Sequence, residues 1–176
     1  MSVPFTLETI SSLDPGTREG LVDLLIAVVD GGASVGFVPP LQREEAGGYW
    51  DSALGPGVHL WVARAGGRIA GTVQLQLAGK ANAVHRAEIA KLMVHPDYRR
   101  HGMARILMQE AERKAAELGR ELLVLDTREG DPSNDLYRSL GWTEAGRIPQ
   151  YAISADGRRD ATVYYYKLLA GGGTGA

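Results

Sequence analysis

Residues 92–104 read LMVHPDYRRHGMA, and the interpretation of the whole chain starts from this stretch. An apolar, strand-like run ends at His95-Pro96, and a helical pattern of apolar residues begins after Gly102. A strand that leads directly into a helix leaves backbone N–H groups without partners at the helix N-terminus, where the helix dipole adds positive potential. The pattern Arg99-x-x-Gly102-x-Ala104 is therefore typical of a site that binds an anion such as a pyrophosphate.

Each residue type in this pattern has a physical role at such a site. Gly102 lets the backbone turn and a phosphate approach closely, and the small Ala104 leaves the first helical turn uncrowded. Arg99 and Arg100 add mobile positive charge. The alternative interpretation is a helix start that is merely flanked by surface arginines, and the six-residue pattern alone does not separate the two. It matches neither the dinucleotide-binding G-x-G-x-x-G pattern nor the phosphate-binding loop G-x-x-x-x-G-K-[ST].

The apolar periodicity predicts strands and helices on both sides of this junction. We expect strands at 5–10, 59–64, 68–77, 87–94, 121–125 and 161–169, helices at 15–30, 41–54, 102–118 and 131–140, and a hairpin turn at 156–158.

A strand, a helix and a second strand follow one another at the centre of this order. The sequence therefore predicts that residues 87–94 and 121–126 form a parallel pair, within a mixed α/β fold whose helices flank the sheet.

Length and composition limit the class of protein. The 176 residues are enough for a single domain at 1–169, followed by a Gly-rich tail at 170–176 that we expect to be disordered. A net charge of −2, from 19 Lys and Arg against 21 Asp and Glu, argues against a nucleic-acid partner.

Several kinds of site and location are disfavoured as well. The absence of Cys excludes disulfide scaffolds, thiolate zinc sites and cysteine nucleophiles. The four histidines have no metal-ligand spacing, so we expect no metal. We find no secretory leader and no apolar run long enough to span a membrane, and we expect a cytoplasmic protein with no membrane partner.

The junction resembles that of the GNAT family of N-acetyltransferases. The resemblance rests on Arg99-x-x-Gly102-x-Ala104 after a strand, and on residues 134–142, NDLYRSLGW, which are similar to the family's Asn…Tyr…Gly-Phe segment. It covers about residues 20–169 and implies a central, mostly antiparallel sheet with one splayed parallel strand pair. Within the family the sequence is most similar to the tabtoxin-resistance acetyltransferases, over residues 31–37, 86–88, 91–94, 125–127 and 156–158.

The resemblance implies that acetyl-CoA is the co-substrate. Backbone N–H groups of residues 100–105 would bind its pyrophosphate, and the main chain of residues 92–94 would pair with the pantetheine arm. The Val94 amide would polarise the thioester carbonyl, in the manner of an oxyanion hole. Asn134 would hydrogen-bond the pantetheine. The cofactor-binding residues implied in this way are Leu92, Met93, Val94, Arg99, Arg100, His101, Gly102, Met103, Ala104, Arg105 and Asn134.

Three residues are candidates for catalysis. Tyr137 matches the family tyrosine that points at the CoA sulfur, so we expect it to act as the general acid, although it could also fill space on a short amphipathic helix. Glu88 lies in mid-strand and Asp126 at the carboxyl end of a buried strand, and both match acidic residues of the tabtoxin-resistance enzymes. Either could accept a proton from the amine. The alternatives are a salt bridge from Glu88 to Arg86 or Lys91, and a turn cap for Asp126.

The predicted activity is acetyl-CoA-dependent acetylation of the primary amine of a small molecule, such as an amino-acid-like toxin or antibiotic. Ser34 and Phe37, in the loop at 31–37, would contact this acceptor. Because there is no cysteine to form an acetyl intermediate, we expect direct transfer in a ternary complex. The alternatives are acetylation of a protein or peptide amine and a non-catalytic CoA-binding module. A homodimer is left open.

Overall fold

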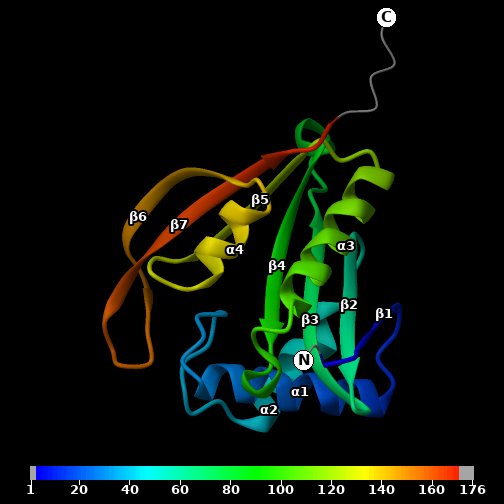
Figure 1. The fold of residues 1–176 in the computed structure, drawn as a ribbon, viewed down its shortest axis with the longest axis vertical. Helices are drawn as coiled ribbons and strands as arrows, with labels where there is room; N and C mark the ends of the chain where they lie inside the picture. The colour runs from blue at the N-terminus through cyan, green and yellow to red at the C-terminus, as the bar shows by residue number, and fades with distance from the viewer. Residues whose placement is uncertain (1–2, 171–176) are drawn as a thin grey trace, which may run out of the picture.

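A seven-stranded sheet runs through the part of the chain that the computed structural model describes, residues 3–170 (Figure 1). Its order is β1-β2-β3-β4-β5-β7-β6, and every neighbouring pair is antiparallel except β4 and β5, which are parallel. The predicted mixed sheet with one parallel pair is therefore confirmed. The strands are β1 (Thr6–Ile10), β2 (Val58–Ala65), β3 (Arg68–Leu77), β4 (Arg86–Val94), β5 (Leu122–Arg128), β6 (Thr143–Ile153) and β7 (Arg159–Leu168).

Helices cover both faces of this sheet, and the alternation of side chains along the strands explains why. On β2, Leu60 and Val62 belong to a core cluster with α1 and α2, whereas Trp61 and Ala63 belong to a second cluster with α3. Figure 1 shows α3 crossing the sheet and α4 lying near the outer strands β6 and β7. The helices are α1 (Pro15–Asp30), α2 (Arg43–Ala53), α3 (Met103–Glu117) and α4 (Ser133–Ser139).

The first two helices are fixed to each other by local sequence signals and one buried hydrogen bond. Asp14 caps α1 by accepting a hydrogen bond from the Thr17 backbone N–H at 3.0 Å, and Pro15 occupies the first helical position. The indole N–H of Trp50 on α2 donates to the Leu21 carbonyl of α1 at 3.0 Å.

The structure differs from the sequence predictions mainly at the outer strand. The sequence pattern predicts no separate strand at residues 143–153, because β6 is exposed along almost its whole length and lacks an apolar alternation. Two short 3₁₀ helices, Ala81–Ala83 and Pro96–Tyr98, were not predicted either. The predicted disordered tail lies outside the described residues from 171 onward.

The parallel pair separates after three residues, and this separation positions the site. Only Arg86–Glu88 of β4 pair with Leu122–Val124 of β5, whereas β4 continues six residues further, to Val94. On its other side β4 stays paired with β3 through an irregular register around Gln74. Lys91 lies at this irregularity and has a left-handed backbone, with φ 51°.

Gly71 of β3 sets how closely α3 approaches the sheet. A Cβ at Gly71 would lie 2.8 Å from the Met103 sulfur, 3.1 Å from Leu107 Cδ1 and 3.1 Å from the Met93 carbonyl oxygen. The first turn of α3 therefore rests directly on the backbone of β3.

We predict that Gly71→Ala lowers the free energy of unfolding by about 1–3 kcal/mol, because α3 must move away from the sheet. Gly79→Ala is the matched control, because a Cβ there meets no atom within 4 Å. Thermal and urea unfolding would measure both variants. Equal stability of the two would show that the close approach at Gly71 is not needed.

Candidate active site

The space opened between β4 and β5 is a cleft of about 1050 Å³. The α1–α2 loop at residues 31–36 lines one end, and residues 98–100 and 102–105, around the start of α3, line another. Both strands, α4 and the β6–β7 hairpin complete its walls. This volume is at the upper end of the range of roughly 300–1,000 Å³ that holds a drug-sized ligand. The cleft therefore has room for two substrates of moderate size.

The edge of β4 that faces the cleft offers free main-chain groups. Met93 and Val94 pair with Thr72 and Gly71 of β3, but their other side has no strand partner, because pairing with β5 stops at Glu88. An extended ligand can bind such an edge as an added strand does, through N–H and C=O groups. The predicted pairing of residues 92–94 with a pantetheine arm fits this geometry.

The anion site is predicted at the N-terminus of α3. Gly102 is the N-cap, with a left-handed φ of 78° and no capping side chain. The first hydrogen bond of the helix runs from the Ile106 N–H to the Gly102 carbonyl at 3.2 Å. The N–H groups of Met103, Ala104 and Arg105 precede this bond, so they are free to bind phosphate oxygens. The side chain of Met103 is buried, so only its backbone can take part.

The three arginines near this helix differ in what they contact. Arg99 Nε lies 3.4 Å from the Val94 carbonyl oxygen, and Arg105 donates to the Ser139 hydroxyl at 2.7 Å, which ties α3 to α4. Both Arg99 and Arg100 are exposed and line the cleft. His101 is half-buried and is not among the residues that line the cleft, so its side chain adds nothing there.

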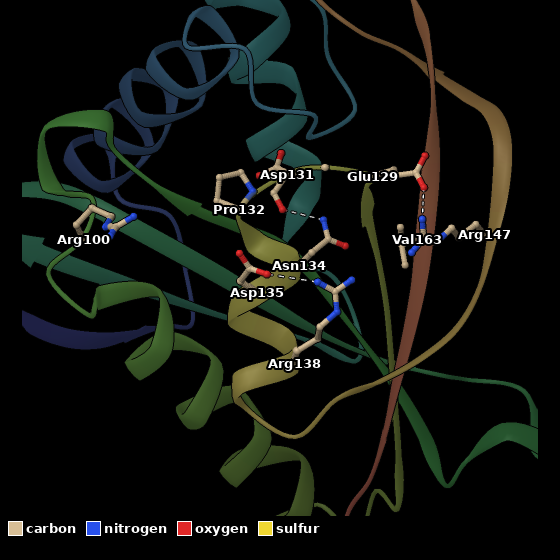
Figure 2. Close-up of a pocket in the computed structure, with 10 residues that line it drawn as sticks. Arg100, Glu129, Asp131, Pro132, Asn134, Asp135, Arg138, Arg147 and Val163 are labelled. Carbon is tan, nitrogen blue, oxygen red and sulfur yellow. Dashed lines mark hydrogen bonds and ion pairs between the residues drawn. The ribbon is translucent and has the colours of Figure 1, made fainter.

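A second, smaller pocket of about 560 Å³ lies beside the loop between β5 and α4 (Figure 2). Its charged side chains neutralise one another: Arg138 lies 3.3 Å from Asp135, and Arg147 pairs with Glu129. Figure 2 shows Arg100 on the turn before α3, apart from these pairs. Because its charges are internally compensated, this pocket is a weaker candidate site than the cleft.

Tyr137 lines the cleft from α4 while its ring packs in the core. Its side chain is only 5% exposed, and its ring centroid lies 5.7 Å from that of Tyr165 and 6.2 Å from that of Trp142. Burial raises the pKa of Tyr137, and the nearby carboxylates of Asp131 and Asp126 raise it further. The hydroxyl therefore keeps its proton over the whole neutral range, as a proton donor requires.

The amide group of Asn134 is largely occupied within the protein. Its Nδ2 donates to the carbonyl oxygens of Arg128, at 2.9 Å, and Asp131, at 2.8 Å, while its Oδ1 accepts from the Tyr165 hydroxyl at 2.8 Å. Only the second lone pair of Oδ1 is left for a ligand. The contact of Asn134 with pantetheine stays a prediction, and its observed contacts hold the β5–α4 loop.

Glu88 and Asp126 lie on the same face of the sheet. Glu88 pairs with Val124, and Asp126 is two residues further along β5, so both side chains point away from the α3 face that holds Ile89 and Leu125. Both side chains are solvent-accessible and line the cleft. Partial burial in the cleft raises the pKa of Glu88, and the repulsion of Asp126 raises it further.

Neither the salt bridge expected as an alternative for Glu88 nor the turn cap expected for Asp126 is observed in the described residues. Glu88 is in no ion pair within 4.0 Å there. Asp126 accepts a hydrogen bond from the Thr162 hydroxyl of β7 at 2.8 Å, rather than from the turn that follows it.

The loop expected to contact the acceptor also lies at the cleft. Ser34 lines it, whereas Phe37 packs edge-on against Tyr49, with 5.6 Å between the ring centroids, and is not among the lining residues. Lys91 connects this loop to β4 by donating to the Val35 carbonyl at 2.7 Å. The sequence pattern suggests Lys91 only as a counter-ion for Glu88. Its contact with Val35 cannot be predicted from local pattern, because it joins residues 56 positions apart and depends on the irregular backbone of β4.

The described residues hold no group of three or more His, Asp or Glu side chains arranged to bind a metal ion. No helix among them is long and apolar enough to cross a membrane.

Comparison with known proteins identifies the family. Residues 30–142 match the model of the acetyltransferase (GNAT) family, which is more than half of the chain. The chain is 36% identical over 149 residues to an uncharacterised N-acetyltransferase of Azospirillum brasilense from the hisH–hisA intergenic region, over 82% of this chain and 89% of the relative. The chain belongs to the GNAT family. It is therefore an acetyl-CoA-dependent N-acetyltransferase.

Two further proteins are similar to the chain. The [ribosomal protein bS18]-alanine N-acetyltransferase of Escherichia coli K12 is 33% identical over 78 residues, which are 44% of this chain and 53% of that one. The solved structure of a candidate phosphinothricin N-acetyltransferase has the same fold, with a TM-score of 0.79, 23% identity, and coverage of 95% of this chain and 99% of that one. The predicted GNAT fold is confirmed.

We predict that Gly102→Ala raises the Kd for acetyl-CoA about tenfold, because alanine resists the left-handed backbone that aims the α3 N–H groups. Gly119→Ala, at the other end of α3, is the control. Its φ is 70° and a Cβ there also meets nothing within 4 Å, so it suffers the same strain away from the cleft. Calorimetric titration with acetyl-CoA would compare the two. Equal Kd values would show that Gly102 does not shape the anion site.

Proposed function

We propose that this GNAT enzyme acetylates the primary amine of a small, amino-acid-like molecule, such as a toxin or antibiotic, by direct transfer in a ternary complex. The observation that carries the proposal is that the α1–α2 loop covers the acceptor side of the cleft. Residues 31–36 of the α1–α2 loop line the cleft, and the 2.7 Å hydrogen bond from Lys91 to the Val35 carbonyl holds this loop against β4. A compact acceptor fits a cleft covered in this way better than an extended chain does.

The acid and base candidates lie on opposite faces of the sheet. Tyr137 belongs to the core cluster on the α3 face, whereas Glu88 and Asp126 face the α1–α2 loop. When bound, acetyl-CoA supplies an acetyl group activated as a thioester. Glu88 or Asp126 accepts a proton from the amine as its nitrogen bonds to the carbonyl carbon. Tyr137 donates a proton to the sulfur as the carbon–sulfur bond breaks.

The main-chain groups complete the proposed machinery. The Val94 N–H would polarise the thioester carbonyl, and the N–H groups of residues 103–105 would hold the pyrophosphate. The likeness to tabtoxin-resistance acetyltransferases, a cytoplasmic location and a homodimer belong to the same proposal.

The direct test is to mix the purified protein with acetyl-CoA and a panel of primary amines and to follow the free thiol. Small amino acids and related amines should release CoA. Short peptides with an N-terminal alanine represent the second candidate function, which the similarity to the bS18-alanine enzyme favours. Turnover of peptides with no turnover of any small amine would replace the proposed acceptor class.

We predict that Tyr137→Phe lowers kcat about 100-fold and leaves the KM for acetyl-CoA nearly unchanged, because the lost hydroxyl acts only on the leaving sulfur. The phenylalanine keeps the ring packing against Tyr165 and Trp142, so the thermal unfolding temperature should change little. Tyr166→Phe, on β7 and outside the cleft lining, serves as the control. A kcat equal to wild type would remove Tyr137 from the acid role.

The raised pKa of Glu88 predicts how activity depends on pH. Burial and Asp126 keep Glu88 protonated up to a higher pH than usual, so kcat/KM should fall as the pH drops through this raised value. Glu88→Gln should remove this acid limb and lower kcat about 100-fold. Asp126→Asn removes the repelling charge, so it should shift the limb to lower pH.

Profiles of kcat/KM against pH for the three proteins would test this assignment. Glu121→Gln is the control, because Glu121 is exposed and does not line the cleft. An acid limb that is unchanged in Glu88→Gln would assign the base elsewhere.

A further inference from the structure

Lys91 is a cation held in the acceptor side of the cleft without a carboxylate partner within the described residues. Its side chain is half-buried, and its Nζ makes one hydrogen bond, to the Val35 carbonyl. An ammonium group has three N–H donors, so two remain. The rings of Phe37 and Tyr49, whose centroids lie 5.8 and 5.3 Å from Nζ, compensate part of the burial.

The backbone of β4 is shaped to place this group. Lys91 has a φ of 51°, a conformation that costs a lysine free energy, and the neighbouring pairing with β3 is irregular. Irregularities of this kind redirect a side chain out of the regular alternation. The loop leaves room for the ammonium group as well, because a Cβ at Gly36 would lie 3.2 Å from Nζ.

One side of the cleft carries charges of both signs, from the Lys91 ammonium group and from the carboxylates of Glu88 and Asp126. Glu88 and Asp126 are close enough to raise the pKa of Lys91, whereas its burial lowers that pKa more strongly. Neither carboxylate comes within 4.0 Å of Nζ in the described residues. Two carboxylates and one separate ammonium group complement a ligand that carries a positive amine and a negative group.

Tyr151 lines the cleft, and its hydroxyl contacts that of Tyr164, which is not among the lining residues. The hydroxyls of Tyr151 and Tyr164 lie 3.0 Å apart, and Tyr164 pairs with Asp126 across β5 and β7. One hydroxyl donates to the other, so one O–H of the pair stays free. The contact with Tyr151 raises the pKa of Tyr164 to about 12, which keeps this proton in place at neutral pH.

We propose that Lys91 binds an anionic group of the acceptor, a carboxylate or a phosphinate, while Glu88 and Asp126 receive its amine. This inference rests on the proposed function and deepens it, because it assigns the recognition of the acceptor's anionic group to Lys91. Lys91 is a specificity-determining residue in this view. The acceptor is a zwitterion whose amine and anion lie a few bonds apart.

The test compares matched acceptors: free α-amino acids, their carboxamides and the corresponding decarboxylated amines, each assayed by CoA release. Wild-type enzyme should prefer the free acid at least tenfold in kcat/KM. Lys91→Met keeps the length of the side chain and removes its charge. It should lower kcat/KM for the acid about 10- to 100-fold, mostly through KM, and leave the amide within twofold.

Two further variants separate recognition from structure. Lys91→Arg should restore part of the preference for the acid, and Lys80→Met, at an exposed position away from the cleft, should behave as wild type. Equal losses for acid and amide in Lys91→Met, with faster proteolysis of the 31–37 loop, would overturn the proposal and make Lys91 a loop tether only.

Two further outcomes distinguish a failure of the proposed Lys91 role from a failure of the proposed function. Equal kcat/KM of wild type for acid and amide overturns the role of Lys91 but leaves the proposed function intact. If wild type acetylates no small amine of any pair, although it binds acetyl-CoA, the proposed function fails and this inference fails with it.

Discussion

The separation of β4 from β5 is the constraint on which the rest of the site depends. Two parallel strands that stop pairing at Glu88 and Val124 leave rows of backbone N–H and C=O groups without partners. Such groups cost free energy when they are buried dry, so the gap must be filled by water or by a polar, extended ligand. The pantetheine arm of acetyl-CoA is a ligand of this kind.

The packing on both faces maintains this separation. On one face, the absence of a side chain at Gly71 lets α3 rest on β3, which fixes the helix N-terminus beside the end of β4. On the other face, Lys91 and the Val35 carbonyl hold the α1–α2 loop against β4. The cleft is therefore bounded by elements that are each anchored in a core cluster. Its geometry does not depend on an exposed loop alone.

The sequence predicts the parts of this arrangement that depend on local pattern. The junction around Gly102 is recognisable because helix starts and left-handed turns restrict residue type locally. The face shared by Glu88 and Asp126 follows from strand alternation once β4 and β5 are paired. The outer strand β6 was missed because exposure removes the apolar signal, and Lys91 because its contacts depend on an irregular register and a distant loop.

The opposite placement of Tyr137 and the two carboxylates restricts how an acceptor can enter. Tyr137 closes the cleft from the α3 face, and the N-terminus of α3 supplies positive potential at that end. In the proposed mechanism an amine therefore approaches from the α1–α2 face, where Glu88 and Asp126 would attract its positive charge. The near-neutral net charge of −2 conceals this division, because the arginines near the start of α3 and the two carboxylates lie in different parts of one cleft. In the proposed mechanism the sheet separates the two proton transfers, so the acid and the base do not neutralise each other.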